Sequence, residues 1–154
     1  MGVKMRIVYL HGRMSGPNAE KCKKLREMGH EVFAPKLVSH DWAQSVTAAR
    51  QVLSETLPDV VIGSSRGGAV AMATNTTVPL VLNAPAWAKY CPWGACRATT
   101  TILHCKTDRI VSYSDSEVLS RTFGADLVEI GNDHRMNDDE TMEKLIEVLK
   151  KHTS

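Results

Sequence analysis

The sequence predicts a three-layer α/β/α sandwich, in which two layers of helices enclose a six-stranded, mainly parallel sheet. Short apolar runs alternate with longer segments whose apolar residues recur at helical spacing, the pattern of successive βαβ units. The chain has 154 residues, of which 43% are hydrophobic and 23% charged. These values are typical of one soluble domain with a sizeable core. We therefore expect a single domain over residues 1–154.

The N-terminal part predicts two strands and two helices. Residues 4–10 contain the run Ile-Val-Tyr-Leu, which is typical of a strand buried on both faces. In residues 19–28 apolar side chains recur at helical spacing, and Gly29 follows where a helix C-cap belongs. A second short strand is expected at residues 31–35. Residues 42–56 carry an amphipathic repeat, and a proline soon afterwards ends that helix.

The rest of the chain continues the alternation. Residues 60–62 and 80–82 are short apolar runs and are expected to form the next two strands. Between them, residues 67–74 are small and apolar all round, and such a helix must be buried against the sheet. The remaining strands and helices are expected at residues 100–104, 114–123, 126–130 and 137–149. Both of these later helices begin with a capping-box sequence. Ligands of such sheets bind beyond the carboxyl ends of the strands.

Charge and composition exclude several classes of function. The net charge is +2 and no dense basic stripe is present, which argues against a nucleic-acid partner. A basic cluster in the first helix alternates with glutamates and is expected to be a solvated face; it consists of Lys21, Lys23, Lys24 and Arg26. No apolar run approaches the ~20 residues that span a bilayer, and no signal-peptide pattern is present. A cytoplasmic protein without a membrane partner is expected, and a homodimer is left open.

The third strand leads into a G-x-S-x-G pentapeptide, residues 63–67, with Ser65 at its centre. A sharp strand-to-helix turn needs small neighbours, and it projects the serine hydroxyl near the positive end of the following helix. A serine that only caps the helix, or a phosphate-binding turn, are the alternatives. Neither G-x-G-x-x-G nor G-x-x-x-x-G-K-[ST] is present. The context therefore predicts Ser65 as a nucleophile.

A base and an acid follow the last two expected strands. His134 lies in the loop after the sixth strand, where a neutral imidazole can take the Ser65 proton. Asp108 follows the fifth strand and can accept a hydrogen bond from His134 Nδ1. Asp133 competes as the orienting carboxylate but, as the neighbour of His134 in sequence, reaches its imidazole with difficulty. His104 lies inside the fifth strand and is expected to be a core histidine with its hydrogen bonds satisfied.

A developing oxyanion needs two donors beside Ser65. One is the backbone N–H of Arg66, the residue after the nucleophile. The other is expected from the loop after the first strand, where the N–H of Arg13 is the first choice and that of Met14 the second. His11 in the same loop is expected to order it.

These motifs resemble the α/β-hydrolase superfamily from the first strand to the last helix. The matching segments are residues 7–12, 63–67, 102–111 and 131–134. The order serine, aspartate, histidine is also that of the superfamily. The resemblance implies a Ser65–Asp108–His134 triad and an ester-type acyl substrate. It also implies a minimal fold without the family's first two strands, with sheet order 4-3-5-6-7-8 in the family's strand numbering. The chain looks most like compact, lid-poor esterase-like members.

Residues 84–97 stand where such proteins insert a cap domain, and they are too few to build one. We expect a short flap whose aromatic residues line the substrate pocket together with Met14, namely Trp87, Tyr90 and Trp93. Packing of these aromatics on the sheet edge is the alternative. Arg13 and Arg66 beside the nucleophile suggest substrates that carry a carboxylate or a phosphate, and side chains that simply point to solvent are the alternative.

The sequence therefore predicts a serine hydrolase that cleaves a carboxylic ester or thioester of a small molecule through an acyl-enzyme on Ser65. A non-catalytic relative that binds a small molecule or a protein is one alternative, and a peptidase or amidase is another. No metal or organic cofactor is implied. The four cysteines are scattered, lack the tight Cys-x-x-Cys pairs of structural zinc sites, and are expected to be reduced thiols.

Overall fold

The computed structural model describes residues 3–152, and these form one parallel sheet of six strands. The strand order is β2-β1-β3-β4-β5-β6, the order that the resemblance implies. The strands are β1 (Arg6–Leu10), β2 (Glu31–Phe33), β3 (Val60–Ser64), β4 (Leu80–Asn83), β5 (Thr101–His104) and β6 (Asp126–Glu129). Each of the five neighbouring pairs is parallel, which confirms the predicted fold class.

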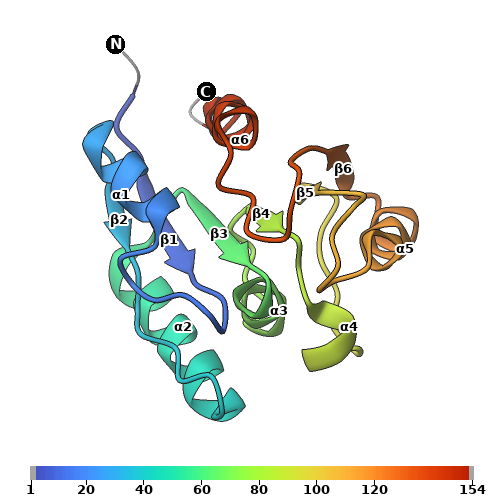
Figure 1. Ribbon diagram of the computed structural model, residues 1–154. Coiled ribbons are helices and arrows are strands. Elements are labelled where there is room, and N and C mark those ends of the chain that lie inside the picture. The colour runs from blue at the N-terminus through green and yellow to red at the C-terminus, as the bar shows by residue number, and fades with distance from the viewer. Residues whose placement is uncertain (1–2, 153–154) are drawn as a thin grey trace.

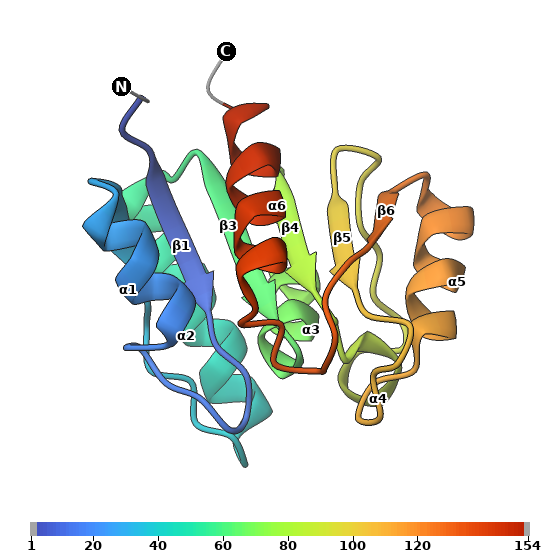
Figure 2. The same cartoon turned by 45° about the horizontal axis from the view of Figure 1, so that its top comes forward.

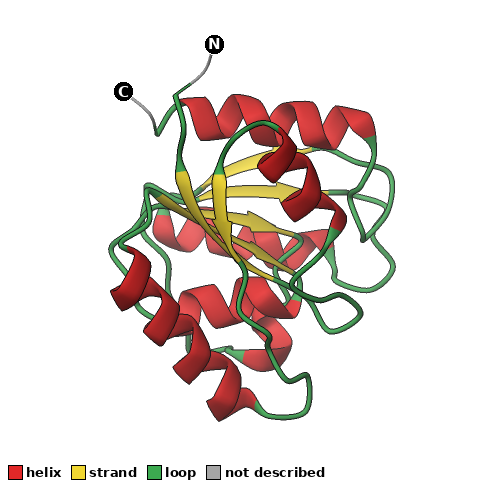
Figure 3. Ribbon diagram, turned by 90° about the vertical axis from the view of Figure 1, so that its left-hand side faces the viewer, coloured by secondary structure: helices red, strands yellow, loops and turns green. Residues whose placement is uncertain are grey.

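Helices cover both faces of this sheet, as Figures 1 and 3 show. They are α1 (Glu20–Glu27), α2 (Trp42–Thr56), α3 (Arg66–Ala73), α4 (Trp87–Tyr90), α5 (Tyr113–Phe123) and α6 (Asp139–Lys150). In Figure 2, α1 and α6 lie in front of the sheet, and α2 and α3 lie behind it. The short helix α4 lies within residues 84–97, which the sequence marks only as irregular.

Two apolar clusters form the core, one on each face of the sheet. Successive side chains of a strand point to opposite faces, so Ile7 and Tyr9 of β1 join one cluster while Val8 and Leu10 join the other. The first cluster also contains the apolar faces of α1 and α6, and the second those of α2, α3 and α5. All six strands run in one direction, so the loops that follow them meet along one edge of the sheet.

The basic cluster of α1 is only partly solvated, which corrects the prediction. Lys23 and Arg26 are exposed, but the Lys21 side chain is only 4% exposed. Lys21 and Leu25 are four residues apart and so share a helix face, and Leu25 is fully buried in the core. The face that carries Lys21 is therefore turned toward the interior.

Both later helices begin at residues other than the predicted capping boxes. Helix α5 starts at Tyr113 after Ser112, whose side chain makes no capping bond. Helix α6 is capped by Asp138, whose carboxylate accepts from the N–H and the hydroxyl of Thr141. The reason for α6 is local: the amide oxygen of Asn137 accepts from Lys21 Nζ, and the carboxylate of Asp138 serves the unpaired N–H groups of the first turn.

The four cysteines are separate free thiols. Residues 3–152 hold no cluster of three or more histidine, cysteine, aspartate or glutamate side chains placed to bind a metal ion. Within the same residues, no helix combines the length and the apolar character that crossing a membrane requires.

Candidate active site

Ser65 occupies the sharp turn between β3 and α3. Its φ is 53°, in the left-handed region that a non-glycine residue adopts only when its surroundings impose it. The two flanking glycines allow this turn. A Cβ on Gly63 would lie 2.7 Å from the carbonyl oxygen of Gly67, and a Cβ on Gly67 would overlap the carbonyl of Leu10 at the end of β1. The pentapeptide is therefore a packing requirement as well as a motif.

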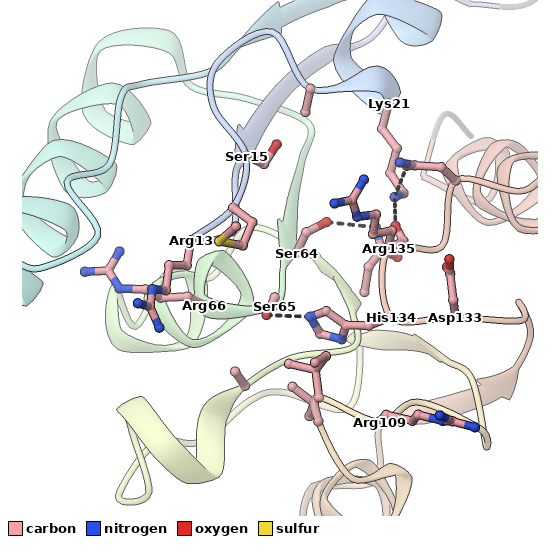
Figure 4. A pocket seen from close by; sticks show the side chains of 18 of the residues that line it. Arg13, Ser15, Lys21, Ser64, Ser65, Arg66, Arg109, Asp133, His134 and Arg135 are labelled. Atoms are coloured by element: carbon pink, nitrogen blue, oxygen red, sulfur yellow. Dashed lines mark hydrogen bonds between the residues drawn. The ribbon is translucent and has the colours of Figure 1, made fainter.

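His134 and Asp108 extend from Ser65 in a continuous hydrogen-bonded series. His134 Nε2 lies 2.9 Å from Ser65 Oγ, and His134 Nδ1 lies 2.7 Å from Asp108 Oδ2 (Figure 4 shows the first of these contacts). The carboxylate accepts from Nδ1–H, so Nε2 is the acceptor for the serine hydroxyl. His134 retains 20% exposure of its side chain, whereas Asp108 is fully enclosed. This arrangement can move a proton from Ser65 to His134 and stabilise the resulting imidazolium.

The Asp108 carboxyl remains ionised despite its burial. Burial raises its pKa. Hydrogen bonds from His134 and from the backbone N–H groups of Val111 and Ile110 lower the pKa by more than burial raises it, so the pKa lies below its usual value. The N–H groups of Ile110 and Val111 lie 2.8 and 2.9 Å from Asp108 Oδ1. Asp133, the competing aspartate, does not contact the imidazole in this structure. Its Oδ1 accepts the N–H of Met136 at 3.0 Å.

The backbone groups considered as oxyanion donors come from the ends of β1 and β3. Arg66 is the first residue of α3, and the N–H groups of a helix's first turn have no intrahelical acceptor. Arg13 lies in a turn closed by a 3.3 Å bond from Ser15 N–H to the carbonyl of Gly12. Gly12 passes so close to Ser65 that a Cβ on it would lie 3.3 Å from the serine Cβ.

His11 orders this loop from the interior. Its Nε2 accepts the N–H of Leu37 at 2.9 Å, so Nδ1 carries the hydrogen that it donates to the carbonyl of Gly12 at 2.8 Å. The imidazole is buried and spans β1 and the segment before α2. His11 therefore holds the loop without facing the Ser65–His134 pair.

A cavity of about 820 Å³ opens beside Ser65 and His134 and is bounded by loops that follow several strands. Met14, Tyr90 and Arg13 line it, as predicted for the first two. Trp87 and Trp93, predicted to line it as well, do not. The Trp87 indole packs on the core face of α2, α3 and α5 and donates to the carbonyl of Asp115 at 3.0 Å, and Trp93 is 74% exposed.

The Arg66 side chain is 2% exposed and runs away from the nucleophile, which corrects its suggested role with an anionic substrate. Its guanidinium donates to Ser45 Oγ at 2.9 Å and to the Val38 carbonyl at 3.1 Å. It also lies over the rings of Trp42 and Tyr90, which stack with centroids 6.0 Å apart. Arg66 thus joins α2 to α4 under the cavity.

Lys21, which the sequence placed on a solvated helix face, lies in the wall of the cavity. Its ammonium donates to the carbonyl of Arg135 at 2.9 Å and to Asn137 Oδ1 at 3.0 Å, so α1 holds the loop that carries His134 (Figure 4). Burial lowers the pKa of Lys21 to about 8, against the opposing effect of Asp138 and Asp133. The available signal was its spacing of four from the buried Leu25.

Comparison with solved structures identifies the fold. The ydeN gene product of B. subtilis is 14% identical, with 97% of this chain and 98% of that chain covered and a TM-score of 0.75. Est1E from Butyrivibrio proteoclasticus is 17% identical (96% and 86% covered, TM-score 0.72). MGS-MChE2, an α/β hydrolase enzyme from the metagenome of lagoon sediments in Morocco, is 19% identical (97% and 90% covered, TM-score 0.72). No protein-family model and no curated protein matches the sequence. The chain has the α/β-hydrolase fold.

Proposed function

We propose that the protein is a serine hydrolase that cleaves a carboxylic ester or thioester through an acyl-enzyme on Ser65. The observation that carries the proposal is the unbroken series from Ser65 Oγ through the His134 imidazole to Asp108 Oδ2, with contacts of 2.9 and 2.7 Å, at the wall of an open cavity. A serine that only caps a helix needs neither contact, and the Ser65 side chain makes no capping bond to α3.

In the acylation step, Ser65 Oγ attacks the acyl carbon while its proton passes to His134 Nε2. Asp108 stays ionised and stabilises the imidazolium through Nδ1. The carbonyl oxygen becomes an oxyanion and accepts from the N–H groups of Arg66 and Arg13, whose alignment on that charge would be worth several kcal/mol of barrier. His134 then returns the proton to the departing alkoxide or thiolate.

In the deacylation step, a water molecule replaces the departed group. His134 Nε2 removes its proton as the oxygen attacks the acyl-enzyme, and the proton returns to Ser65 Oγ when the carboxylic acid leaves. Neither of these proposed steps requires a metal or an organic cofactor. The name of one similar structure agrees with this class, since MGS-MChE2 is described as an α/β hydrolase enzyme.

The cavity supports a small-molecule acyl substrate with an exposed end. The only helix within residues 84–97 has four residues, so little structure covers the cavity there. Met14 and Tyr90 offer apolar surface beside Ser65, and Lys89 and Arg109 add polar groups. We expect such an enzyme to act on soluble esters in the cytoplasm.

The test is covalent labelling with a fluorophosphonate, read by intact-mass and peptide mass spectrometry. We expect one adduct on Ser65 in the wild-type protein and none in Ser65→Ala. Ser64→Ala is the matched control, because Ser64 is the adjacent serine but its hydroxyl contacts Tyr9 and Asn83 instead of His134. This control should label like the wild type. A wild-type protein that is folded and stays unlabelled at neutral pH would favour the non-catalytic alternative.

A panel of p-nitrophenyl esters, acyl thioesters and anilides of short acids then separates the reaction classes. Turnover of esters or thioesters that is lost in Ser65→Ala supports the proposal. Turnover of the anilides alone would assign an amidase.

A further inference from the structure

The Asp108 carboxylate has a second histidine partner that the proposed mechanism does not use. His104, the last residue of β5, places its Nε2 3.1 Å from Asp108 Oδ2. This is the same oxygen that accepts from His134 Nδ1 at 2.7 Å. The side chains of His104 and Asp108 are both 0% exposed, so water cannot substitute for the contact between them.

The contacts of the His104 ring define where its hydrogen lies. Nε2 is also 3.1 Å from the carbonyl oxygen of Val111, which can only accept, so Nε2 carries the hydrogen. Nδ1 lies 2.6 Å from Ser116 Oγ. Burial lowers the pKa of His104, although Asp108 opposes this, so the ring is neutral and Nδ1 accepts the Ser116 hydroxyl. The acceptors Val111 and Asp108 therefore fix the tautomer that donates to Asp108, and Ser116 Oγ satisfies Nδ1 and orients the ring.

With this bond, every accepting direction of the carboxylate is in use. Oδ2 accepts from two histidines, and Oδ1 accepts from the N–H groups of Ile110 and Val111. The two backbone donors belong to the Asp108 loop itself, whereas His104 belongs to the sheet. Its ring also contacts Tyr113 of α5, with centroids 5.5 Å apart. If only the loop held the carboxylate, the carboxylate would move whenever the loop moves. The bond from His104 ties the carboxylate to β5 and, through Tyr113, to α5.

We propose that His104 is a positioning residue that holds Asp108 Oδ2 toward His134, with Ser116 holding the His104 ring in the donating orientation. The proposal rests on the proposed function for its kinetic test, since the acid acts on substrate only through His134 and Ser65. It extends the site from three residues to five, in the order Ser65, His134, Asp108, His104, Ser116.

The first test compares two substitutions of His104. His104→Leu removes the donor, and we expect kcat to fall roughly 10- to 100-fold with KM nearly unchanged, the loss of one hydrogen bond to a charged group. His104→Gln keeps an N–H close to the position of Nε2 and should recover most of that loss. A purely structural role would give equal effects in the two variants or act on KM.

The second test uses two serines of the same helix. Ser116→Ala leaves the buried Nδ1 without its partner and removes the bond that orients the ring, so kcat should fall, though by less than in His104→Leu. Ser120→Ala is the matched control, because the Ser120 hydroxyl donates to the carbonyl of Ala125 and does not reach His104. This control should keep wild-type kcat. Circular dichroism and thermal unfolding establish that each variant is folded.

A third measurement does not need catalysis. The proton between His134 Nδ1 and Asp108 Oδ2 should give a low-field ¹H NMR resonance that moves in His104→Leu and in Ser116→Ala but not in Ser120→Ala. If His104→Leu does not fold, Ser116→Ala decides the question alone. Wild-type kcat and an unmoved resonance in a folded His104→Leu or Ser116→Ala would overturn the proposal. If fluorophosphonate fails to label Ser65 while the resonance moves as expected, the proposed function fails and the network stands.

Discussion

Asp108 and Asp133 are the two aspartates that could orient the His134 imidazole. The direction in which each carboxylate points decides between them. Asp108 comes from the loop after β5 and meets Nδ1 at 2.7 Å. Asp133 is the neighbour of His134 in sequence, but its carboxylate turns back to the N–H of Met136, which has a φ of 54°. Asp133 therefore shapes the loop that carries His134, and Asp108 is the group that can orient the imidazole.

Replacing the two aspartates should accordingly have unequal effects. In Asp108→Asn the amide can present an N–H to Nδ1, which favours the wrong imidazole tautomer, and kcat should fall about ten-thousand-fold. Asp133→Asn keeps a carbonyl oxygen for Met136, so kcat should stay within a few-fold of wild type. Steady-state hydrolysis of one ester by both variants checks this. A large loss in Asp133→Asn with a small one in Asp108→Asn would reverse the assignment of the acid.

Single residues also mark where sequence reasoning reaches its limit. Ser65, Asp108 and His134 could be located because each follows a strand, and strand ends of a parallel sheet converge. Lys21 and Arg66 could not, because a long side chain reaches partners that its own segment does not specify. Arg66 ends on Ser45 of α2, and Lys21 ends on a carbonyl 114 residues away. The bond from His104 to Asp108 depends on the shape of an irregular loop, which periodicity does not describe.

At the scale of elements, the position of the nucleophile depends on how closely α3 approaches β1. The first turn of α3 lies against the carbonyls of Leu10 and His11, and Gly67 leaves no room there for a side chain. The same contact sets the distance between Ser65 and the loop after β1. Packing of one helix on one strand therefore controls both proposed oxyanion donors.

Gly67→Ala should disturb stability and activity together. We expect the free energy of unfolding, measured by urea denaturation, to fall by about 1 to 3 kcal/mol, because α3 must move away from β1 to admit a methyl group. Ester turnover should fall as well, since the turn at Ser65 moves with the helix. Gly16→Ala is the control, because no atom lies within 4 Å of a Cβ added there. A Gly67→Ala protein with wild-type stability would show that α3 and the end of β1 are not in close contact at this position.

The elements themselves were largely predictable. Every predicted strand is present, and its bounds differ from the observed ones by at most two residues. Short β-branched runs and helical apolar spacing are strong signals when a sheet is covered on both faces. Helix α4 was not predicted, because a single turn of four residues carries too few positions to show a period. Because α4 was not predicted, the sequence analysis also placed Trp87 and Trp93 in the cavity.

For the molecule as a whole, Lys21 joins the first helix to the segment that precedes the last. The ammonium on α1 holds Arg135 and Asn137, just before α6 begins. Both helices lie on the same face of the sheet, as Figure 2 shows, and share one apolar cluster. A charged group at this junction makes the stability of the whole fold depend on pH.

The direction of that dependence follows from the pKa of Lys21, which burial lowers from 10.5 to about 8. Between pH 8 and 10 the unfolded chain holds more protons on Lys21 than the folded one, so the free energy of unfolding rises with pH. Relative to Lys21→Met, the wild type should gain about 2 kcal/mol over this interval. Urea denaturation of both proteins at several pH values measures the difference. A difference that does not change with pH would contradict the buried ammonium.

The chain order of the Ser65–His134–Asp108 series has a consequence for biosynthesis. A ribosome makes Ser65 first, Asp108 next and His134 last, 69 residues after the serine. A nascent chain that has emerged only through α5 contains the strained turn and the carboxylate but not the imidazole that joins them. The proposed hydrolase would therefore acquire its reactivity in one late event, when β6 adds to the edge of the sheet and α6 docks on its face. Until then the growing polypeptide lacks the base that the proposed mechanism requires.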